Sequence, residues 1–105
     1  MRKFMIALLG ASVLAGAAEA YDGEQFVVCK LNPLGDNFLA LRSCGSTSCD
    51  VIRKLGPDTF VITMEPYATN GWREVIVQQS SQDWSYAGVK GWVYGKYICH
   101  VDLSE

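Results

Sequence analysis

Short stretches in which apolar and polar residues alternate recur along this chain, and they predict β-strands rather than helices. Residues 59–64 read TFVITM, so that positions 60, 62 and 64 fall on one face of a strand and positions 61 and 63 on the other. Leu39 and Leu41 alternate in the same way with Ala40 and Arg42. Further strands are predicted within residues 26–31, 51–55, 72–78, 89–93 and 97–101. No long amphipathic helical pattern occurs, which indicates a small all-β barrel or sandwich of five to six short antiparallel strands.

Two irregular segments interrupt these strands. Residues 43–50 consist mainly of Ser, Gly and Thr, the residues of turns, with Cys44 and Cys49 near the two ends. Residues 79–88 are polar except for Trp84, Tyr86 and a small Ala-Gly end, and they show no core periodicity. A short 3₁₀ turn is predicted at residues 94–97.

The predicted core takes one face of each strand. Its members are Val28, Leu39, Leu41, Val51, Ile52, Leu55, Val61, Val75, Val77 and Val93. For residues 59–64 the alternation does not say which face is inward, so Phe60, Ile62 and Met64 remain an alternative set, because a slip of one residue exchanges the two faces.

Residues 39–55 carry the string L-A-L-R-S-x-x-S-T-S-x-x-V-I-x-x-L, which resembles the opening motif of bacterial SH3-like domains. Matches to later parts of that family's pattern follow in order at residues 70–72 (NGW), 91–93 (GWV) and 97–98 (YI). The resemblance extends from Phe26 to Val101. Cys44 departs from it by standing where the family usually has a glycine, and the hairpin between strands 72–78 and 89–93 is longer than usual. The resemblance implies an SH3-like barrel and ligands such as peptidoglycan stem peptides.

The first twenty residues have the pattern of a secretory signal peptide. Arg2 and Lys3 precede an apolar run over residues 4–15, and the segment ends in Ala18-Glu19-Ala20. The run is too short to span a bilayer, which needs roughly 20 apolar residues. We therefore expect residues 1–20 to be cleaved, residues 21–105 to form one SH3-like domain without a membrane span, and the protein to be periplasmic or secreted.

Four cysteines in a secreted chain indicate two disulfides, and they allow three connectivities. A zinc site is not expected, because the closest pair, Cys44 and Cys49, is separated by four residues rather than two. The compact turn between these two cysteines can bring their Cα atoms within the roughly 4.4–6.8 Å that a disulfide requires. Cys29 and Cys99 then remain for the second bridge. The SH3-like resemblance places the first and last strands, which carry them, side by side.

Catalytic chemistry is not expected. The chain has one histidine, His100, near its end, and its acidic residues follow no recognisable spacing. No enzyme activity, cofactor or metal is predicted. The formal net charge is −2 with no basic patch, so nucleic acid is not expected as a partner.

Large aromatic residues point instead to recognition. Trp72, Trp92 and Tyr97 lie at strand ends, and we interpret them as packing residues. Tyr67, Trp84, Tyr86 and Tyr94 fall in loops or turns, where a rigid barrel usually carries its binding surface. We predict that Trp84 and Tyr86 form this surface, with Tyr67 and Tyr94 as neighbours. The expected function is a non-catalytic binding module for cell-wall peptide or glycan or for an envelope protein. The alternative is a stand-alone inhibitor or immunity-type protein that blocks a secreted toxin or cell-wall hydrolase.

Overall fold

The computed structural model describes residues 21–103, which form an all-β domain; the predicted signal peptide, residues 1–20, lies outside the described residues. The strands are β1 (Gln25–Val28), β2 (Leu39–Arg42), β3 (Val51–Leu55), β4 (Phe60–Thr63), β5 (Trp72–Val77), β6 (Lys90–Tyr94) and β7 (Ile98–His100). A 3₁₀ turn, η2 (Gly95–Tyr97), connects β6 to β7, as the sequence predicted.

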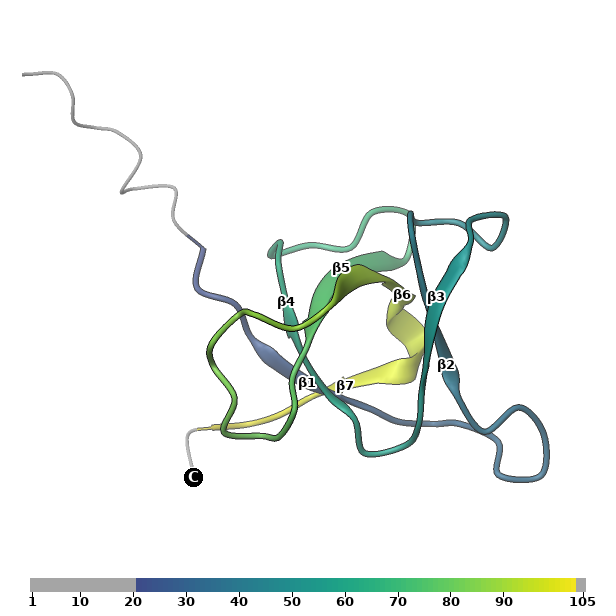
Figure 1. The fold of residues 1–105 in the computed structure, drawn as a ribbon, viewed down its shortest axis with the longest axis horizontal. Helices are drawn as coiled ribbons and strands as arrows, with labels where there is room; N and C mark the ends of the chain where they lie inside the picture. Colours follow the sequence, from purple (N-terminus) through teal and green to yellow (C-terminus); the bar gives the residue numbers. More distant parts are fainter. Residues whose placement is uncertain (1–20, 104–105) are drawn as a thin grey trace, which may run out of the picture.

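All seven strands belong to one antiparallel sheet in the order β3-β2-β6-β5-β4-β1-β7. β3 and β7 form its two ends and are not paired with each other, so the sheet is open. The expected total of five to six strands is too low, because each of the seven segments in which a strand was predicted forms one. Figure 1 shows that the strands nevertheless curve around a common centre.

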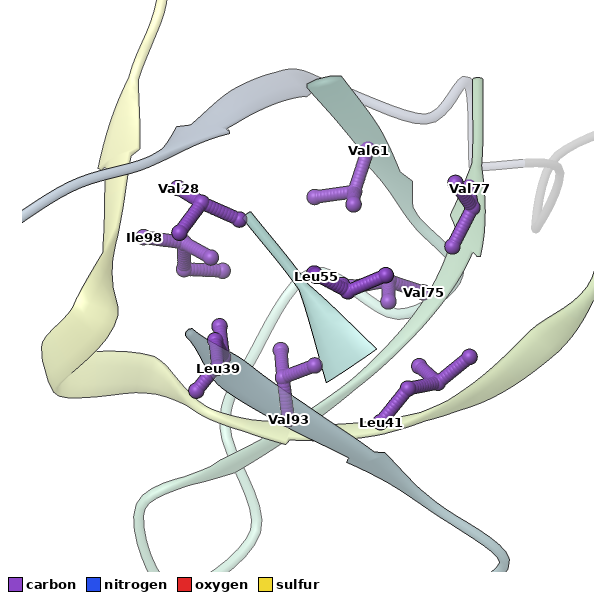
Figure 2. Packing of buried hydrophobic residues seen from close by; sticks show 9 residues of the cluster. All are labelled: Val28, Leu39, Leu41, Leu55, Val61, Val75, Val77, Val93 and Ile98. Carbon is purple, nitrogen blue, oxygen red and sulfur yellow. The ribbon is translucent and has the colours of Figure 1, made fainter. Parts of the chain in front are cut away.

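The core lies at this centre and joins residues from both ends of the sheet. Val28 and Ile98 from β1 and β7 belong to the same buried cluster as Leu41 and Leu55 from β2 and β3. Figure 2 shows their side chains converging with those of Val61, Val75 and the other cluster members. Only a strongly curved sheet can bring its two ends to one core, and this curvature creates an outer face on which the candidate sites lie.

The prediction that Val51 and Ile52 belong to the core is wrong. Val51 and Ile52 are each 46% exposed, whereas Leu55 in the same strand is buried. The pairing of β3 with β2 shifts between Leu41 and Arg42, so the first residues of β3 leave the regular alternation. Because β3 is also an edge strand, no further strand covers these side chains.

Strand β4 is buried on both faces, which explains why its alternation was ambiguous. Val61 faces the core cluster, and its neighbour Ile62 is equally buried on the opposite face. Ile62 lies beside Ile76 of β5, a buried residue that the sequence analysis missed. A Cβ at Gly23 would collide with Ile62, so the segment before β1 lies directly over this outer pair.

Both predicted disulfides are present. Cys29 and Cys99 have Cα atoms 6.0 Å apart, next to the pairing of β1 with β7, and those of Cys44 and Cys49 are 5.6 Å apart. By the chain-entropy estimate, the bridge that closes the long loop contributes about 4 kcal/mol to the free energy of unfolding and the short one about 2 kcal/mol. Within residues 21–103, no helix is long and apolar enough to cross a membrane.

Candidate binding groove

A groove of about 820 Å³ runs along β2. One wall is formed by Gly45, Ser46 and Thr47, which belong to the segment between the paired cysteines (residues 44–49, the cystine loop). A second, aromatic wall adjoins it and consists of Trp72, Tyr94 and Tyr97. Figure 1 shows the loops before and after β2 protruding on the same side of the molecule, and residues of both line the groove.

The aromatic wall is positioned by a tight turn. Thr69 and Trp72 exchange backbone hydrogen bonds of 2.8 and 2.9 Å around Asn70 and Gly71, whose φ angles are 51° and 86°. This is the two-residue hairpin geometry that Asn-Gly favours, because both central residues need positive φ. The turn places Trp72 at the first position of β5, directly across from Tyr94 of β6.

The three rings of this wall contact one another in sequence. Trp72 and Tyr94 meet edge to face with centroids 5.4 Å apart. The ring centroids of Tyr94 and of Tyr97, the last residue of η2, are 6.4 Å apart. Tyr94 is 40% exposed, so the wall offers ring surface to solvent although its members support one another. Such rigid, partly exposed aromatic area loses little conformational entropy when a ligand covers it.

The cystine loop is held in place by covalent and polar contacts. The disulfide closes the cystine loop, and the Arg42 guanidinium donates hydrogen bonds to the carbonyl oxygens of Thr47 at 3.0 Å and Cys49 at 2.9 Å. A Cβ at Gly45 would lie 3.2 Å from Cβ of Trp72 and 3.3 Å from Cε3 of Trp92. The loop therefore packs closely against both indole side chains.

The groove also carries polar groups of mixed character. Lys30 and Arg42 bring positive charge, Asp36 brings negative charge, and Asn32 and Asn70 bring side-chain amides. An aromatic wall with amide and charged groups suits a ligand that combines flat or CH-rich surface with hydrogen-bonding groups. Among residues 21–103, no three or more His, Cys, Asp or Glu side chains gather in a way that could hold a metal ion.

The four predicted binding residues do not form one surface. Tyr94 lines the groove, and Tyr67 lines a separate hollow beside Trp92. Trp84 and Tyr86 lie in residues 79–88 (the hairpin loop) and line neither concavity. Trp84 and Tyr86 are 40% and 42% exposed, so they are partly covered by the rest of the domain.

The hairpin loop is tied to the sheet by buried polar contacts. The side-chain amide of Gln25 donates to Oε1 of Gln78 at 3.0 Å and to the carbonyl oxygen of Ser81 at 2.8 Å. The amide of Gln78 donates in turn to the carbonyl oxygen of Asp83 at 2.6 Å. Both glutamine side chains are buried, so these bonds replace water that they have lost.

Tyr86 and Asp83 fix the tip of the same loop. The Tyr86 hydroxyl accepts a hydrogen bond from the backbone N–H of Gly23 at 3.2 Å. The backbone φ of Tyr86 is 60°, which is unfavourable for a large side chain, so contacts must hold this residue in place. The backbone N–H of Gln79 and the N–H and hydroxyl of Ser85 donate to the Asp83 carboxylate. These bonds hold the pKa of Asp83 below its usual value.

Trp72 and Tyr97 are the groove residues that the sequence analysis interpreted as packing. One signal could have separated Trp72 from the core. Val75 and Val77 face inward, and a strand alternates, so Trp72 at an even position must face outward. For Tyr97 no such signal exists, because it belongs to a 3₁₀ turn.

Comparison with protein-family models, with curated proteins and with solved structures found no match to this chain. We therefore infer the function from the groove.

Proposed function

We propose that this protein is a non-catalytic binding module of the bacterial SH3-like class, and that it binds cell-wall peptide or glycan, or a segment of an envelope protein, in the groove. The observation that carries the proposal is the groove's pair of rigid walls. Trp72, Tyr94 and Tyr97 support one another, and a covalently closed loop packs beside them against Trp72. A preorganised site of this kind loses little entropy on binding.

Two features support the SH3-like assignment and the location. The motif over residues 39–55 is accompanied by a 3₁₀ turn before the last strand and by pairing of the first strand with the last. The signal-like residues 1–20 and the two disulfides agree with an oxidising compartment outside the cytoplasm, so we place the protein in the periplasm or outside the cell.

Wall material fits the groove by chemistry. Sugar rings present CH-rich faces that pack on aromatic side chains, and stem peptides present amides and carboxylates. Arg42 and Lys30 provide positive charge for the carboxylates, and Asn32 and Asn70 provide partners for the amides. No step of bond cleavage is required of any of these residues.

Sedimentation with purified sacculi tests this function. We expect the protein to pellet with sacculi in a saturable manner, and we expect soluble muropeptides to compete. A sample in which a globular protein of similar charge replaces this one controls for trapping. Recovery of all the protein in the supernatant at high sacculus concentration would refute wall binding.

A protein inhibitor is the second candidate, and one observation favours it. Leu34 is 96% exposed at the tip of a turn in which Gly35 donates a backbone hydrogen bond to Asn32, a residue of the groove rim. A fully exposed leucine on a protruding turn presents apolar area, and burying that area in a pocket of a partner protein would be favourable. If this is the function, the protein slows the solubilisation of sacculi by a secreted wall hydrolase, and Leu34→Asp abolishes the effect while leaving sacculus sedimentation unchanged.

A further inference from the structure

A second hollow, distinct from the groove, lies on the outer face of the sheet beyond the end of β4. It has a volume of about 420 Å³ and is lined by Glu65, Pro66, Tyr67, Thr69, Glu74 and Trp92. The first four belong to the turn between β4 and β5, and the last two stand opposite each other on β5 and β6. We call it the acidic hollow, because both of its charged lining residues are glutamates.

The charge of Glu74 is only loosely balanced within the protein. Its side chain is 23% exposed, and Nζ of Lys90 lies 3.8 Å from Oε2, beyond ordinary hydrogen-bonding distance. The Lys90 side chain itself is 57% exposed and does not line the hollow. A partly buried carboxylate beside an open hollow attracts a cation that can enter it.

The other nearby cations are directed elsewhere. Arg73 donates to the backbone carbonyl oxygen of Glu65 at 2.9 Å, not to its carboxylate. Arg42, which is paired with Trp92 across the sheet, donates to carbonyl oxygens of the cystine loop. Neither arginine lines the acidic hollow.

Two aromatic residues complete the lining. Trp92 contributes its indole, and Tyr67 is 80% exposed, so burial in the core does not account for its position. An ammonium or guanidinium group is attracted to the faces of such rings, most strongly to Trp, and carboxylates beside the rings add to this attraction. Neutral or anionic groups receive no comparable benefit.

We propose that the acidic hollow is a binding subsite for a positively charged side chain, the ammonium of a lysine-like residue or the guanidinium of an arginine, carried by a peptide or protein ligand. The site does not depend on what the groove binds. It is placed to extend it, however, because Gly45 of the groove wall lies against both Trp72 of the groove and Trp92 of the hollow.

An NMR titration of the folded protein with Nα-acetyl-lysine methylamide tests the proposal. We expect saturable shifts of the Trp92 indole N–H with a dissociation constant on the order of 10 mM, as suits a single exposed cation–π contact assisted by carboxylates. The neutral norleucine derivative is the matched control, and it should produce no saturable shift. The corresponding arginine derivative shows whether guanidinium is preferred to ammonium, and sodium chloride at equal ionic strength controls for salt.

Two single-residue variants test the role of the Glu74 charge. Glu74→Gln keeps the shape of the hollow and should weaken lysine binding about fivefold, whereas Lys90→Gln removes the internal competitor for Glu74 and should strengthen it about twofold. Equal shifts with the norleucine derivative, unchanged affinity in Glu74→Gln, or no saturation with either cation would overturn the proposal. Because no wall material is used, failure of sacculus binding and failure of this inference are separate results.

Discussion

The cystine loop and the hairpin loop look alike in the sequence, since both are turn-rich, polar and close to aromatic residues, but the structure uses them differently. The hairpin loop carries its aromatic residues itself, and Tyr86 and Asp83 are hydrogen-bonded within the domain. The cystine loop carries none, yet it lines the same groove as Tyr94, which lies on a strand and is 40% exposed. We infer that a candidate binding surface depends on what the internal contacts leave available, rather than on the aromatic content of a loop.

The largest expected effect is the loss of stability when a methyl group is added at a glycine of the hairpin loop, compared with a glycine of the cystine loop. A Cβ at Gly88 would collide with the carbonyl oxygen of Val77, so Gly88→Ala must displace the end of the hairpin loop. We expect it to lower the free energy of unfolding by about 3 kcal/mol, the upper part of the usual range for overpacking. Gly45→Ala in the cystine loop is the matched variant, since its Cβ meets side chains at 3.2 Å or more, and it should cost about 1 kcal/mol or less. Urea unfolding measures both, and a neutral Gly88→Ala would show that the loop is not packed as described.

Opening the cystine loop is the next test. Replacing Cys44 and Cys49 by Ser removes the short bridge and should cost about 2 kcal/mol in the free energy of unfolding. It also frees a groove wall, so affinity for the groove ligand should fall while the hairpin loop keeps its amide-exchange protection. Ser48→Ala is the control that removes the side-chain contact with Ser46 but leaves the loop closed and the groove lining unchanged. Unchanged affinity in the variant with both Cys44→Ser and Cys49→Ser would show that binding does not depend on the disulfide.

A smaller loss is expected when the hairpin loop is detached from the sheet. Gln78→Leu removes the amide that bonds to Asp83 and the oxygen that accepts from Gln25. The Gln25 amide keeps its bond to Ser81, so we expect a loss of about 1–2 kcal/mol. Hydrogen exchange should rise across residues 79–88 and remain unchanged in the cystine loop. Uniform loss of protection in both loops would mean that they are not independent.

The smallest effect depends on pH and is confined to the hairpin loop. Because the pKa of Asp83 is lower in the folded state than its ordinary value of 3.8, its ionised form stabilises the fold above pH 3.8, and this contribution disappears as pH falls through the folded pKa. Asp83→Asn should therefore be less stable than the parent at neutral pH, and the difference should shrink below pH 3.8. Thermal unfolding of both proteins between pH 2 and pH 7 measures this difference. A difference that is constant with pH would assign the effect to lost shape rather than to charge.

Alternation and turn chemistry were sufficient to predict the strands, η2 and the Cys44–Cys49 bridge, because these depend on local patterns. The Cys29–Cys99 bridge depends on the pairing of the chain ends, which was expected from the SH3-like resemblance. The burial of Val51 and Ile52 was predicted wrongly, since a local pattern does not reveal that β3 is an edge strand with a shifted register. The two-sided burial at Val61 and Ile62 also depends on distant segments, here the residues around Gly23.

The candidate site was harder to predict than the fold. Tyr94 was named as a candidate because a turn was predicted there, and it is the last residue of β6. The groove combines β2, the cystine loop and the ends of β5 and β6, which only the sheet order brings together. The hydrogen bonds that occupy the hairpin loop also join residues more than fifty positions apart, such as Gln25 and Gln78. No periodicity in the sequence carries that information.

The central claim is that the groove, and not the hairpin loop, is the binding surface, and two tyrosines provide a matched test. Tyr94 lines the groove and is 40% exposed, while Tyr86 lies in the hairpin loop and is 42% exposed. The decisive measurement is the affinity of Tyr94→Ala and of Tyr86→Ala for sacculi, at a temperature where both variants are folded. We expect Tyr94→Ala to weaken binding at least tenfold, about 1.4 kcal/mol, and Tyr86→Ala to bind within about twofold of the parent. A tenfold loss in Tyr86→Ala with unchanged binding in Tyr94→Ala would contradict the claim and return the binding surface to the hairpin loop.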